Sequence, residues 1–366
     1  MISIVLLAVF SITANADDME RWINDLKDPS RSVRNAAAIA LGNLNNSSAV
    51  EPLILTLNDS DVHVRRNAVD ALGKLNNSSA VEPLILTLND SDLYVRRNAV
   101  DALSKLNNSS AIEPFSTLML SDKDKKIRKM AAESLGKLNS SSEVGSLIQA
   151  LKDKDEDTRY EAAKALGKIN DTRAKWALIR AIKDKQEDPR VKYEAVEALS
   201  KINDTGVMRS LIQAFKDNNT TVRLAAGETL FDMNAVTTLI PSLNNYFYPG
   251  VRVQAAEILG KLNSSIAVEP LIEALDDDNR NVTFAAVEAL GKLNDTQAVG
   301  PLLRTLENTD PLIRSAAANS LGNLHDTRAV GFLIQALKDD DIRVQLAAAE
   351  ALDKLNITFD ADGSDI

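Results

Sequence analysis

Apolar residues recur along this chain at the spacing of an α-helix. In one stretch, Val64, Ala68, Ala71, Leu72 and Leu75 follow one another at i, i+4, i+7, i+8 and i+11, which places them on a single helical face. Polar and charged residues lie between most of them. The pattern predicts an amphipathic helix with one buried stripe, here called helix A.

A second helical pattern follows after a polar turn. Val81, Leu84, Ile85 and Leu88 have the same spacing, and Pro83 falls in the first turn, where a missing N–H matters least. This stretch predicts a second helix, here called helix B. The first-turn proline recurs at Pro52, Pro114, Pro270 and Pro301.

The turns between the helices carry residues that cap helix ends. Asn, Asp, Ser and Thr side chains bond to nearby backbone N–H groups. Ser79, with Glu82 three residues later, has the form of a capping box and predicts Ser79 as the N-cap of helix B. Acidic loops such as 89–92 are expected to cap the next helix A, and Asp310-Pro311 combines a cap with proline at the first helical position.

The A–B pattern repeats along nearly the whole chain. The place of Leu72 in helix A is filled by a leucine every 31 residues, with slips to 29, 32 and 33. A fixed period of this size indicates a solenoid, in which each helix pair buries its apolar face against the next. The marker residues are Leu41, Leu72, Leu103, Leu135, Leu166, Leu199, Leu230, Leu259, Leu290, Leu321 and Leu352. The sequence predicts an all-α fold of about eleven such pairs.

Helix A also repeats an acid four residues before a lysine, as in Asp70 with Lys74 and Glu288 with Lys292. This order stabilises a helix by about 0.2 to 0.5 kcal/mol per pair. We interpret these columns as a solvated outer surface and not as a binding site.

Composition narrows the function classes. A length of 366 residues would suggest two or three domains, but stacked repeats make one elongated core. Hydrophobic residues make up 45% of the chain and aromatic residues only 4%, which suits small, tightly packed helices. The net charge of -10 argues against a nucleic-acid partner. The chain has no cysteine, which excludes disulfides, thiolate metal sites and a cysteine nucleophile.

The first sixteen residues differ from the repeats. The apolar run 2–10, followed by Ala14-Asn15-Ala16, predicts a signal peptide over 1–16, although no basic residue precedes the run. The alternative is an extra helix that caps the first repeat. We favour export, because a chain that begins at Asp17 would start at a repeat helix. The solenoid is then expected over 17–356, with no stable membrane span after signal removal and a disordered acidic tail over 357–366.

The consensus Val-Arg-x-x-Ala-Ala-x-Ala-Leu-Gly-x-Leu, followed by Ala-Val-x-Pro-Leu-Ile-x-Ala-Leu, resembles the HEAT-like repeat of phycobilisome (PBS) lyases. The resemblance runs from about Asp18 to Asn356. It implies an armadillo-like, right-handed superhelix of antiparallel helix pairs, with the B helices on the concave side.

The resemblance also implies a ladder of basic residues that face loop aspartates. It is broken at Thr283 and Gln345. The matching positions are Arg34, Arg65, Arg96, Arg128, Arg159, Lys192, Arg223, Arg252 and Arg314.

The sequence offers no catalytic centre. The similar deoxyhypusine hydroxylases bind iron through paired His-Glu motifs, whereas His63, expected in an inter-repeat loop, and His325, expected in an A-to-B turn, are not followed by Glu. We therefore expect no catalytic residue, no metal site and no cofactor. The acidic clusters 153–157, 276–278 and 339–341 have the oxygen ligands that calcium prefers. Because they recur in one loop of successive repeats, we favour helix capping over weak calcium binding.

A partner surface is predicted where apolar residues interrupt a polar column of helix B. Leu55 and Leu86 hold one position in adjacent repeats where most later repeats are polar. The alternative is that both leucines pack against flanking helices. A partner here would bring apolar groups with a basic rim, because acids lie one turn earlier. The predicted contact residues are Glu51, Leu55, Glu82, Leu86, Glu113 and Thr117.

One repeat is irregular. Phe231-Asp232-Met233-Asn234 replaces the usual Gly-Lys-Leu-Asn, and the next loop contains Tyr246, Phe247 and Tyr248. These aromatic residues either form a recognition loop or fill a packing fault in a shortened repeat, and we slightly favour the second interpretation.

Glycosylation sequons recur in the A-to-B turn. If the chain is exported by a cell that N-glycosylates proteins, sugars would follow one edge of the solenoid. The candidates are Asn46, Asn77, Asn108, Asn139, Asn170, Asn203, Asn263 and Asn294.

Together these patterns predict a secreted or cell-surface, non-enzymatic scaffold that binds a protein or peptide in its concave groove. With steps of roughly 8 to 10 Å between helices, the repeats would form a curved rod about 100 Å long. The alternatives are an enzyme of the bilin lyase or deoxyhypusine hydroxylase type and a glycosylated cell-envelope component. If residues 1–16 are retained, we expect a cytoplasmic protein.

Overall fold

The computed structural model describes residues 16–202, 205–245 and 248–357, and every regular element in these ranges is helical. This confirms the predicted all-α solenoid. The chain divides into two compact units, an N-terminal unit of residues 1–178 and a C-terminal unit of residues 179–366. Each unit is described by itself.

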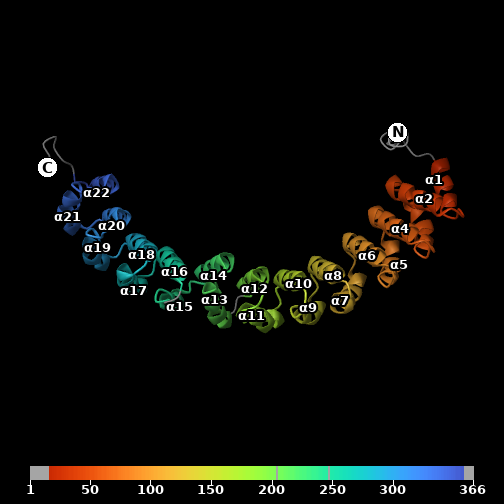
Figure 1. The fold of residues 1–366 in the computed structure, drawn as a ribbon, viewed down its shortest axis with the longest axis horizontal. Helices are drawn as coiled ribbons and strands as arrows, with labels where there is room; N and C mark the ends of the chain where they lie inside the picture. Colours follow the sequence, from red (N-terminus) through yellow and green to blue (C-terminus); the bar gives the residue numbers. More distant parts are fainter. Residues whose placement is uncertain (1–15, 203–204, 246–247, 358–366) are drawn as a thin grey trace. The chain divides into compact units, whose positions relative to one another are not determined.

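Long A helices alternate with shorter B helices along each unit (Figure 1). The A helices are α2 (Arg31–Leu44), α4 (Val62–Leu75), α6 (Leu93–Leu106), α8 (Lys125–Leu138), α10 (Glu156–Ile169), α12 (Pro189–Lys201), α14 (Thr220–Asp232), α16 (Pro249–Leu262), α18 (Arg280–Leu293), α20 (Pro311–Asn323) and α22 (Ile342–Lys354). The B helices are α1 (Ala16–Asp25), α3 (Val50–Thr56), α5 (Val81–Thr87), α7 (Ile112–Ser121), α9 (Val144–Ala150), α11 (Lys175–Lys183), α13 (Met208–Phe215), α15 (Val236–Leu239), α17 (Val268–Glu273), α19 (Val299–Thr305) and α21 (Val330–Ala336).

Local side chains define both ends of the A helices. In α4 the side chain of Asp61 accepts hydrogen bonds from the backbone N–H groups of His63 (2.9 Å) and Val64 (3.4 Å). The helix ends at Asn76, whose φ of 47° lies in the left-handed region that asparagine tolerates better than most residues. Within the described ranges, seven A helices end in this way, at Asn45, Asn76, Asn107, Asn139, Asn170, Asn263 and Asn294.

The predicted capping box is wrong. A 3-10 turn, Ser78–Ala80, precedes α5, and Asn77 caps that turn by accepting a hydrogen bond from the N–H of Ser79 at 2.9 Å. Helix α5 then begins at Val81 without a side-chain cap. The N-cap role moves to the asparagine because the 3-10 turn places the first free N–H groups two residues earlier than a direct helix start would.

The core lies between the A and B layers of each repeat. Val64, Leu72 and Leu84 are fully buried, as the helical spacing predicted. Ile85 is only half-buried. The third buried residue of α5, after Val81 and Leu84, is instead Thr87, whose hydroxyl donates to the carbonyl of Pro83 at 2.8 Å, so its polar group is satisfied within the helix.

The predicted placement of the B helices on the concave side is wrong. Within each unit the row of helices bends, and the A helices line the inner side of the bend (Figure 1). Glycines explain this, because neighbouring A helices approach one another closely. A Cβ on Gly42 would lie 2.7 Å from the Cα of Ala71, and one on Gly260 would lie 2.8 Å from the Cα of Ala289. The A layer is therefore the shorter one, and its acid–lysine columns lie on the inner side.

The repeat built from α14 and α15 is irregular, as the sequence indicated. Helix α15 has only four residues. Phe231 holds the position that glycine holds in most A helices, and Ile258 of α16 takes the place of the facing alanine. The methyl Cδ1 of Ile258 lies 2.9 Å from where a Cβ on Gly227 would be, so bulky side chains replace the small Gly–Ala contact here.

Several predictions fall beyond the described ranges. These concern most of the predicted signal peptide, residues 358–366 of the predicted tail, the sequon Asn203, and both Tyr246 and Phe247. None of the helices in the described ranges is long and apolar enough to span a bilayer.

Candidate functional site

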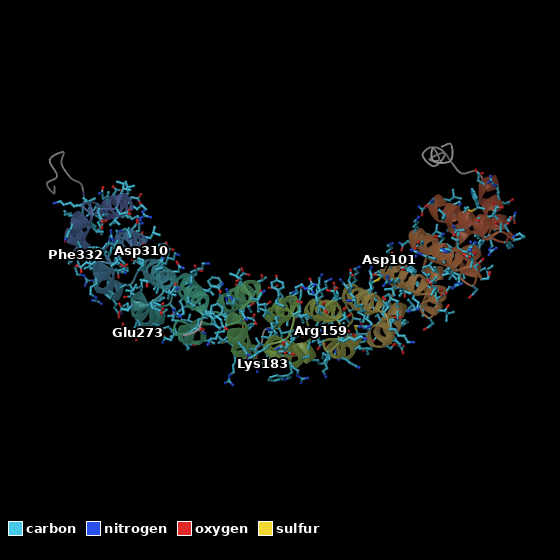
Figure 2. The ribbon with its side chains drawn as sticks, in the orientation of Figure 1. Asp101, Arg159, Lys183, Glu273, Asp310 and Phe332 are labelled. Carbon is cyan, nitrogen blue, oxygen red and sulfur yellow. The ribbon has the colours of Figure 1, made fainter. Side chains whose placement is uncertain are left out.

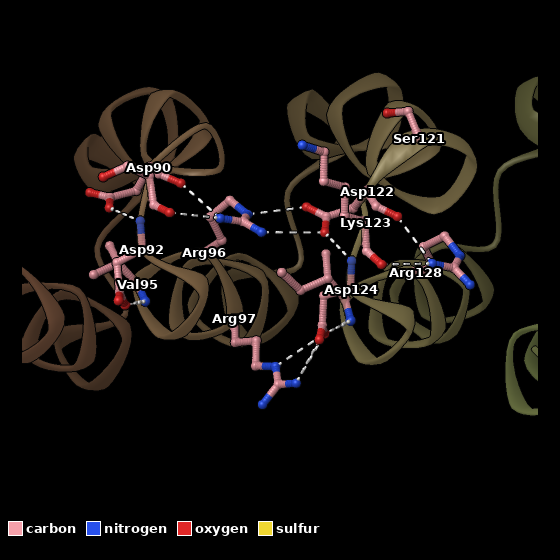
Figure 3. Close-up of polar contacts among 12 residues, drawn as sticks. Asp90, Asp92, Val95, Arg96, Arg97, Ser121, Asp122, Lys123, Asp124 and Arg128 are labelled. Carbon is pink, nitrogen blue, oxygen red and sulfur yellow. Dashed lines mark hydrogen bonds and ion pairs between the residues drawn. The ribbon is translucent and has the colours of Figure 1, made fainter.

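A ladder of ion pairs joins successive repeats at the start of each A helix. The guanidinium of Arg96 donates to both carboxylate oxygens of Asp122 in the next loop, at 3.1 and 3.4 Å, and to the carbonyl of Asp90 at 3.0 Å (Figure 3). Asp122 also accepts the N–H of Asp124 at 2.8 Å, so one carboxylate joins two repeats and shapes its own loop. Ion pairs of this kind join Arg34 to Asp59, Arg65 to Asp90, Arg96 to Asp122, Arg128 to Asp153, Lys192 to Asp217, Arg252 to Asp277, and Arg314 to Asp339.

The ladder pairs are largely shielded from solvent. The side chain of Arg128 is 4% exposed. Burial raises the pKa of Asp153, but the hydrogen bonds from Arg128 and from the N–H of Asp155, together with the charge of Arg128, hold the pKa below its usual value. The hydrogen bond from Arg314 likewise lowers the pKa of Asp339 to about 2. In the pairs of Arg128 with Asp153 and of Arg314 with Asp339, both carboxylate oxygens accept hydrogen bonds from the guanidinium. We therefore interpret the ladder as a structural element and not as a binding site.

The ladder is interrupted in the C-terminal unit. Thr283 and Gln345 carry no charge, yet each still donates to the loop carbonyl, Thr283 to Asp277 at 3.2 Å and Gln345 to Asp339 at 2.6 Å. Arg223 donates to two carbonyls, but its buried Nε has no hydrogen-bond partner among the described residues. In the N-terminal unit, Arg159 holds the ladder position of α10 and donates to the carbonyl of Asp153 at 2.8 Å.

The inner side of the N-terminal unit carries a second set of ion pairs. Arg97, next to the ladder position, donates to Asp124 at 3.0 Å (Figure 3), and Lys129 contacts Asp157 at 3.4 Å. The ring of Tyr94 lies between two guanidinium groups, 5.0 Å from that of Arg66 and 5.7 Å from that of Arg97.

The predicted acid–lysine pairs form only in part. Lys105 contacts Asp101 at 2.6 Å, and Lys292 contacts Glu288 at 3.5 Å. Lys74 instead donates to Asn43 of the preceding A helix at 2.9 Å, because that amide lies on the neighbouring helix within reach.

The histidines do not form a metal site with other described residues. His63 lies in the first turn of α4 and not in a loop, which corrects the sequence interpretation, because the cap residue is Asp61. His325 lies in the A-to-B turn, with Nδ1 3.2 Å from the carbonyl oxygen of Lys354. Among the described residues no group of three His, Cys, Asp or Glu side chains is close enough to hold a metal ion. Arg252 contacts both Asp277 and Asp278 of one acidic cluster.

Leu55 of α3 and Leu86 of α5 are the most exposed large apolar residues among those described, at 73% and 75%. They lie on the B side of the N-terminal unit, so they do not face the inner side of the bend. The same column position in α17 is Glu273, which points away from the A helices (Figure 2).

The remaining predicted contact residues surround these leucines or lie elsewhere. Glu51, Glu82 and Glu113 are exposed one helical turn before the column. Thr117 is exposed, and its hydroxyl donates to the carbonyl of Glu113 at 3.1 Å. Tyr248 is exposed at the N-cap of α16, on the other unit.

The sequon asparagines occupy two settings. Asn46, Asn77 and Asn108 each accept the N–H of the serine two residues later at 2.9 Å. A second group is exposed at the left-handed ends of A helices, and it consists of Asn139, Asn170, Asn263 and Asn294.

An apolar row lies on the A helices of the C-terminal unit and was not predicted from the sequence. The residue that follows the ladder position is Leu224 in α14, Val253 in α16, Phe284 in α18 and Leu346 in α22. Aligning the repeats on the ladder arginine would have revealed this row. It was missed because the polar face of helix A was assigned to the outer surface.

Comparison with solved structures shows a shared fold. A structure of Kap95p with RanGDP matches 93% of this chain and 56% of that chain, with a TM-score of 0.56 and 14% identity. Importin beta matches 92% of this chain and 55% of that chain, with a TM-score of 0.53 and 14% identity. Human deoxyhypusine hydroxylase matches 68% of this chain and 96% of that chain, with a TM-score of 0.32 and 22% identity.

Sequence comparison gives the family. No curated protein matches the chain. A family model described as HEAT repeats matches residues 19–85, 81–146, 144–230, 236–321 and 301–362, which together span most of the helix pairs. With antiparallel helix pairs stacked in each unit and joined by basic residues, this protein belongs to the HEAT repeat family.

Proposed function

We propose that this protein is a non-enzymatic scaffold that binds a partner protein, and that Leu55 and Leu86 anchor this partner. The observation that carries the proposal is the high exposure of two leucines at one position of adjacent B helices. Packing against flanking helices does not account for them, because about three quarters of each residue stays in contact with solvent. Solenoids commonly use such extended surfaces for recognition.

The charge around the leucines indicates the chemistry of the partner. Glu20, Glu51, Glu82 and Glu113 hold one position in four successive B helices, and all are exposed. None of these carboxylates forms an ion pair with another residue in the described ranges. A partner segment with apolar side chains and a basic rim would satisfy both the leucines and this acidic row.

The double variant Leu55→Asp/Leu86→Asp tests the proposal. Partner capture by the immobilised full-length protein from its native host should be lost, because charge replaces the apolar anchor. The matched control is Gln213→Asp/Gln335→Asp, which adds the same charges to the same column in the other unit. Circular dichroism should show an intact helical fold in both variants. Capture of the same partner by the leucine variant would contradict the proposal.

We also propose that the chain is exported and that it belongs to the phycobilisome lyase-like group of HEAT repeats. The apolar run 2–10 with Ala14-Asn15-Ala16 supports export, and the repeat consensus supports the group. Intact-mass measurement with N-terminal sequencing tests export. A start at Asp17 with added mass supports export with glycosylation, whereas a start at Met1 without added mass contradicts both.

A further inference from the structure

The A helices of the C-terminal unit carry an apolar row on the inner side of the bend. Leu224 and Leu346 are 49% and 57% exposed, and Val253 and Phe284 are half-buried. The row covers three successive repeats, is interrupted by Ser315, and resumes in the last A helix. We refer to Leu224, Val253, Phe284 and Leu346 as the inner apolar row.

An acidic row lies beside it. Glu228, Glu257, Glu288 and Glu350 follow the four apolar residues by four positions, so each lies one helical turn further along the same face. All four are exposed. Acidic and basic residues nearly balance in residues 1–178, so most of the net charge of -10 lies in residues 179–366. The unit that carries the inner apolar row is therefore the one that attracts positive charge.

The fold itself does not require apolar residues at these positions. In the N-terminal unit the same place is held by Asn35, Arg66, Arg97, Lys129 and Tyr160, and two of these, Arg97 and Lys129, are ion-paired to the next loop. The A-helix packing thus accommodates charged side chains here. Exposed apolar residues on a single face, without a structural requirement, indicate a contact surface.

We propose that the inner apolar row binds a basic amphipathic α-helix of a partner protein. Neighbouring packed helices lie roughly 8 to 10 Å apart and an α-helix rises about 1.5 Å per residue, so one repeat corresponds to about five to seven residues of a bound helix. An apolar residue at about every seventh position would meet Leu224, Val253 and Phe284 in turn. Lysine or arginine at the flanking positions would face Glu228 and Glu257, and would compete with Lys292 for Glu288.

This surface is separate from the one around Leu55 and Leu86. It lies on the A helices of the other unit. It requires a helical partner with apolar residues at a fixed spacing, whereas Leu55 and Leu86 on the B helices do not require a helix. The two proposals can therefore fail independently.

The experiment uses the full-length protein and a fluorescent synthetic helix of about 21 residues, with leucine at every seventh position and lysines beside it. Two control peptides have the same composition in shuffled order, or glutamate in place of lysine. Fluorescence anisotropy measures binding to the wild type, to Leu224→Ser/Leu346→Ser and to Glu257→Lys/Glu288→Lys. Gln213→Ser/Gln335→Ser, on the B helices of the same unit, is the matched control protein. All substituted side chains are exposed, and circular dichroism verifies the fold.

We expect the leucine and glutamate variants to weaken binding by about tenfold or more, and the glutamine control on the B helices to bind as the wild type does. Binding should also weaken as salt rises. Equal binding of the shuffled or glutamate peptide would overturn the proposal. Unchanged binding by Leu224→Ser/Leu346→Ser would also overturn it. So would sedimentation data showing that the wild type self-associates through these residues and that the variant does not.

Discussion

The two units use the same repeat for different purposes. In the N-terminal unit the ladder arginines Arg34, Arg65, Arg96 and Arg128 all form ion pairs with the following loop. In the C-terminal unit paired steps alternate with steps that lack the pair, at Arg223 and Thr283. On the inner side, the residue after the ladder position is basic in three repeats of the first unit and apolar in four repeats of the second.

The difference shows which features the solenoid requires. Close Gly–Ala contacts and the buried apolar stripe recur in both units, so they define the fold. The ladder charge and the residue after it vary, so they can be changed without loss of the helix pairs. Stability should therefore depend more on ion pairs in the N-terminal unit, whereas the C-terminal unit leaves its inner side available for recognition.

The largest expected effect comes from breaking a paired step. Arg128→Met leaves Asp153 in a shielded site without its partner, so local stability in α8 and α10 should fall by about 3 kcal/mol. Thr283→Val, at the same position of a neutral step, removes one hydrogen bond and should cost about 1 kcal/mol. Hydrogen exchange with mass spectrometry measures both. Similar losses of stability in the two variants would show that the ion pairs do not make the two units differ in stability.

A second effect concerns the close contact between A helices. Gly136→Ala places a Cβ 2.9 Å from that of Ala165, and overpacking should cost about 1 to 3 kcal/mol. Gly145→Ala in the neighbouring B helix meets no atom within 4 Å, so it should stabilise the helix by about 0.5 kcal/mol. Thermal unfolding compares the two. Equal effects would mean that the close approach of α8 and α10 at Gly136 does not require glycine.

Acid should weaken the ladder with a defined sign. Hydrogen bonds from Arg314 hold the folded pKa of Asp339 at about 2, and those from Arg128 lower the pKa of Asp153 against the effect of burial. Because these folded pKa values lie below the unfolded ones, the stabilisation is present at neutral pH and is lost as pH falls from about 4 towards 2.

The Arg128→Met variant tests this origin of acid sensitivity. Without the guanidinium, Asp153 loses the hydrogen bonds that lower its pKa most, so exchange protection of α8 and α10 should depend less on pH in the variant than in the wild type. Parallel pH profiles for the two proteins would contradict the assignment to this pair.

The sequence predicted the helices well and their arrangement less well. Val64 and Leu72 are buried because helical spacing alone determines which side chains share a face. The side of the bend could not be read from that spacing, because it depends on how closely helices 31 residues apart approach, as at Gly42 and Ala71. The cap of helix B was missed because a 3-10 turn and an α-helix start with the same residue types, such as Asn77 and Ser79.

The exposure of Leu55 and Leu86 followed from the column pattern, since neither residue lies on the buried stripe of its helix. The inner apolar row was overlooked for the opposite reason. Leu224 and Phe284 stand in a helix face that is otherwise charged, and only alignment of the repeats separates them from the core.

The smallest expected effect comes from restoring a missing pair in the C-terminal unit. The carbonyl of Asn245 accepts the guanidinium of Arg252 at 2.7 Å, as the carbonyl of Asp90 accepts that of Arg96, so Asn245 holds the place of a ladder aspartate. Asn245→Asp would give Arg223 a carboxylate and should raise stability by about 1 kcal/mol.

Asn308→Asp is the matched control for this substitution. Its carbonyl accepts Arg314 at 2.9 Å, so Asn308 also holds the place of a ladder aspartate, but the residue opposite is Thr283, which has no charge to pair with it. The control should therefore gain nothing in thermal unfolding, while Asn245→Asp gains. If both substitutions raise the melting temperature equally, the gain comes from loop acidity alone. A gain only at Asn245 would mean that the interrupted ladder, and not the shortened helix α15, limits the stability of this step.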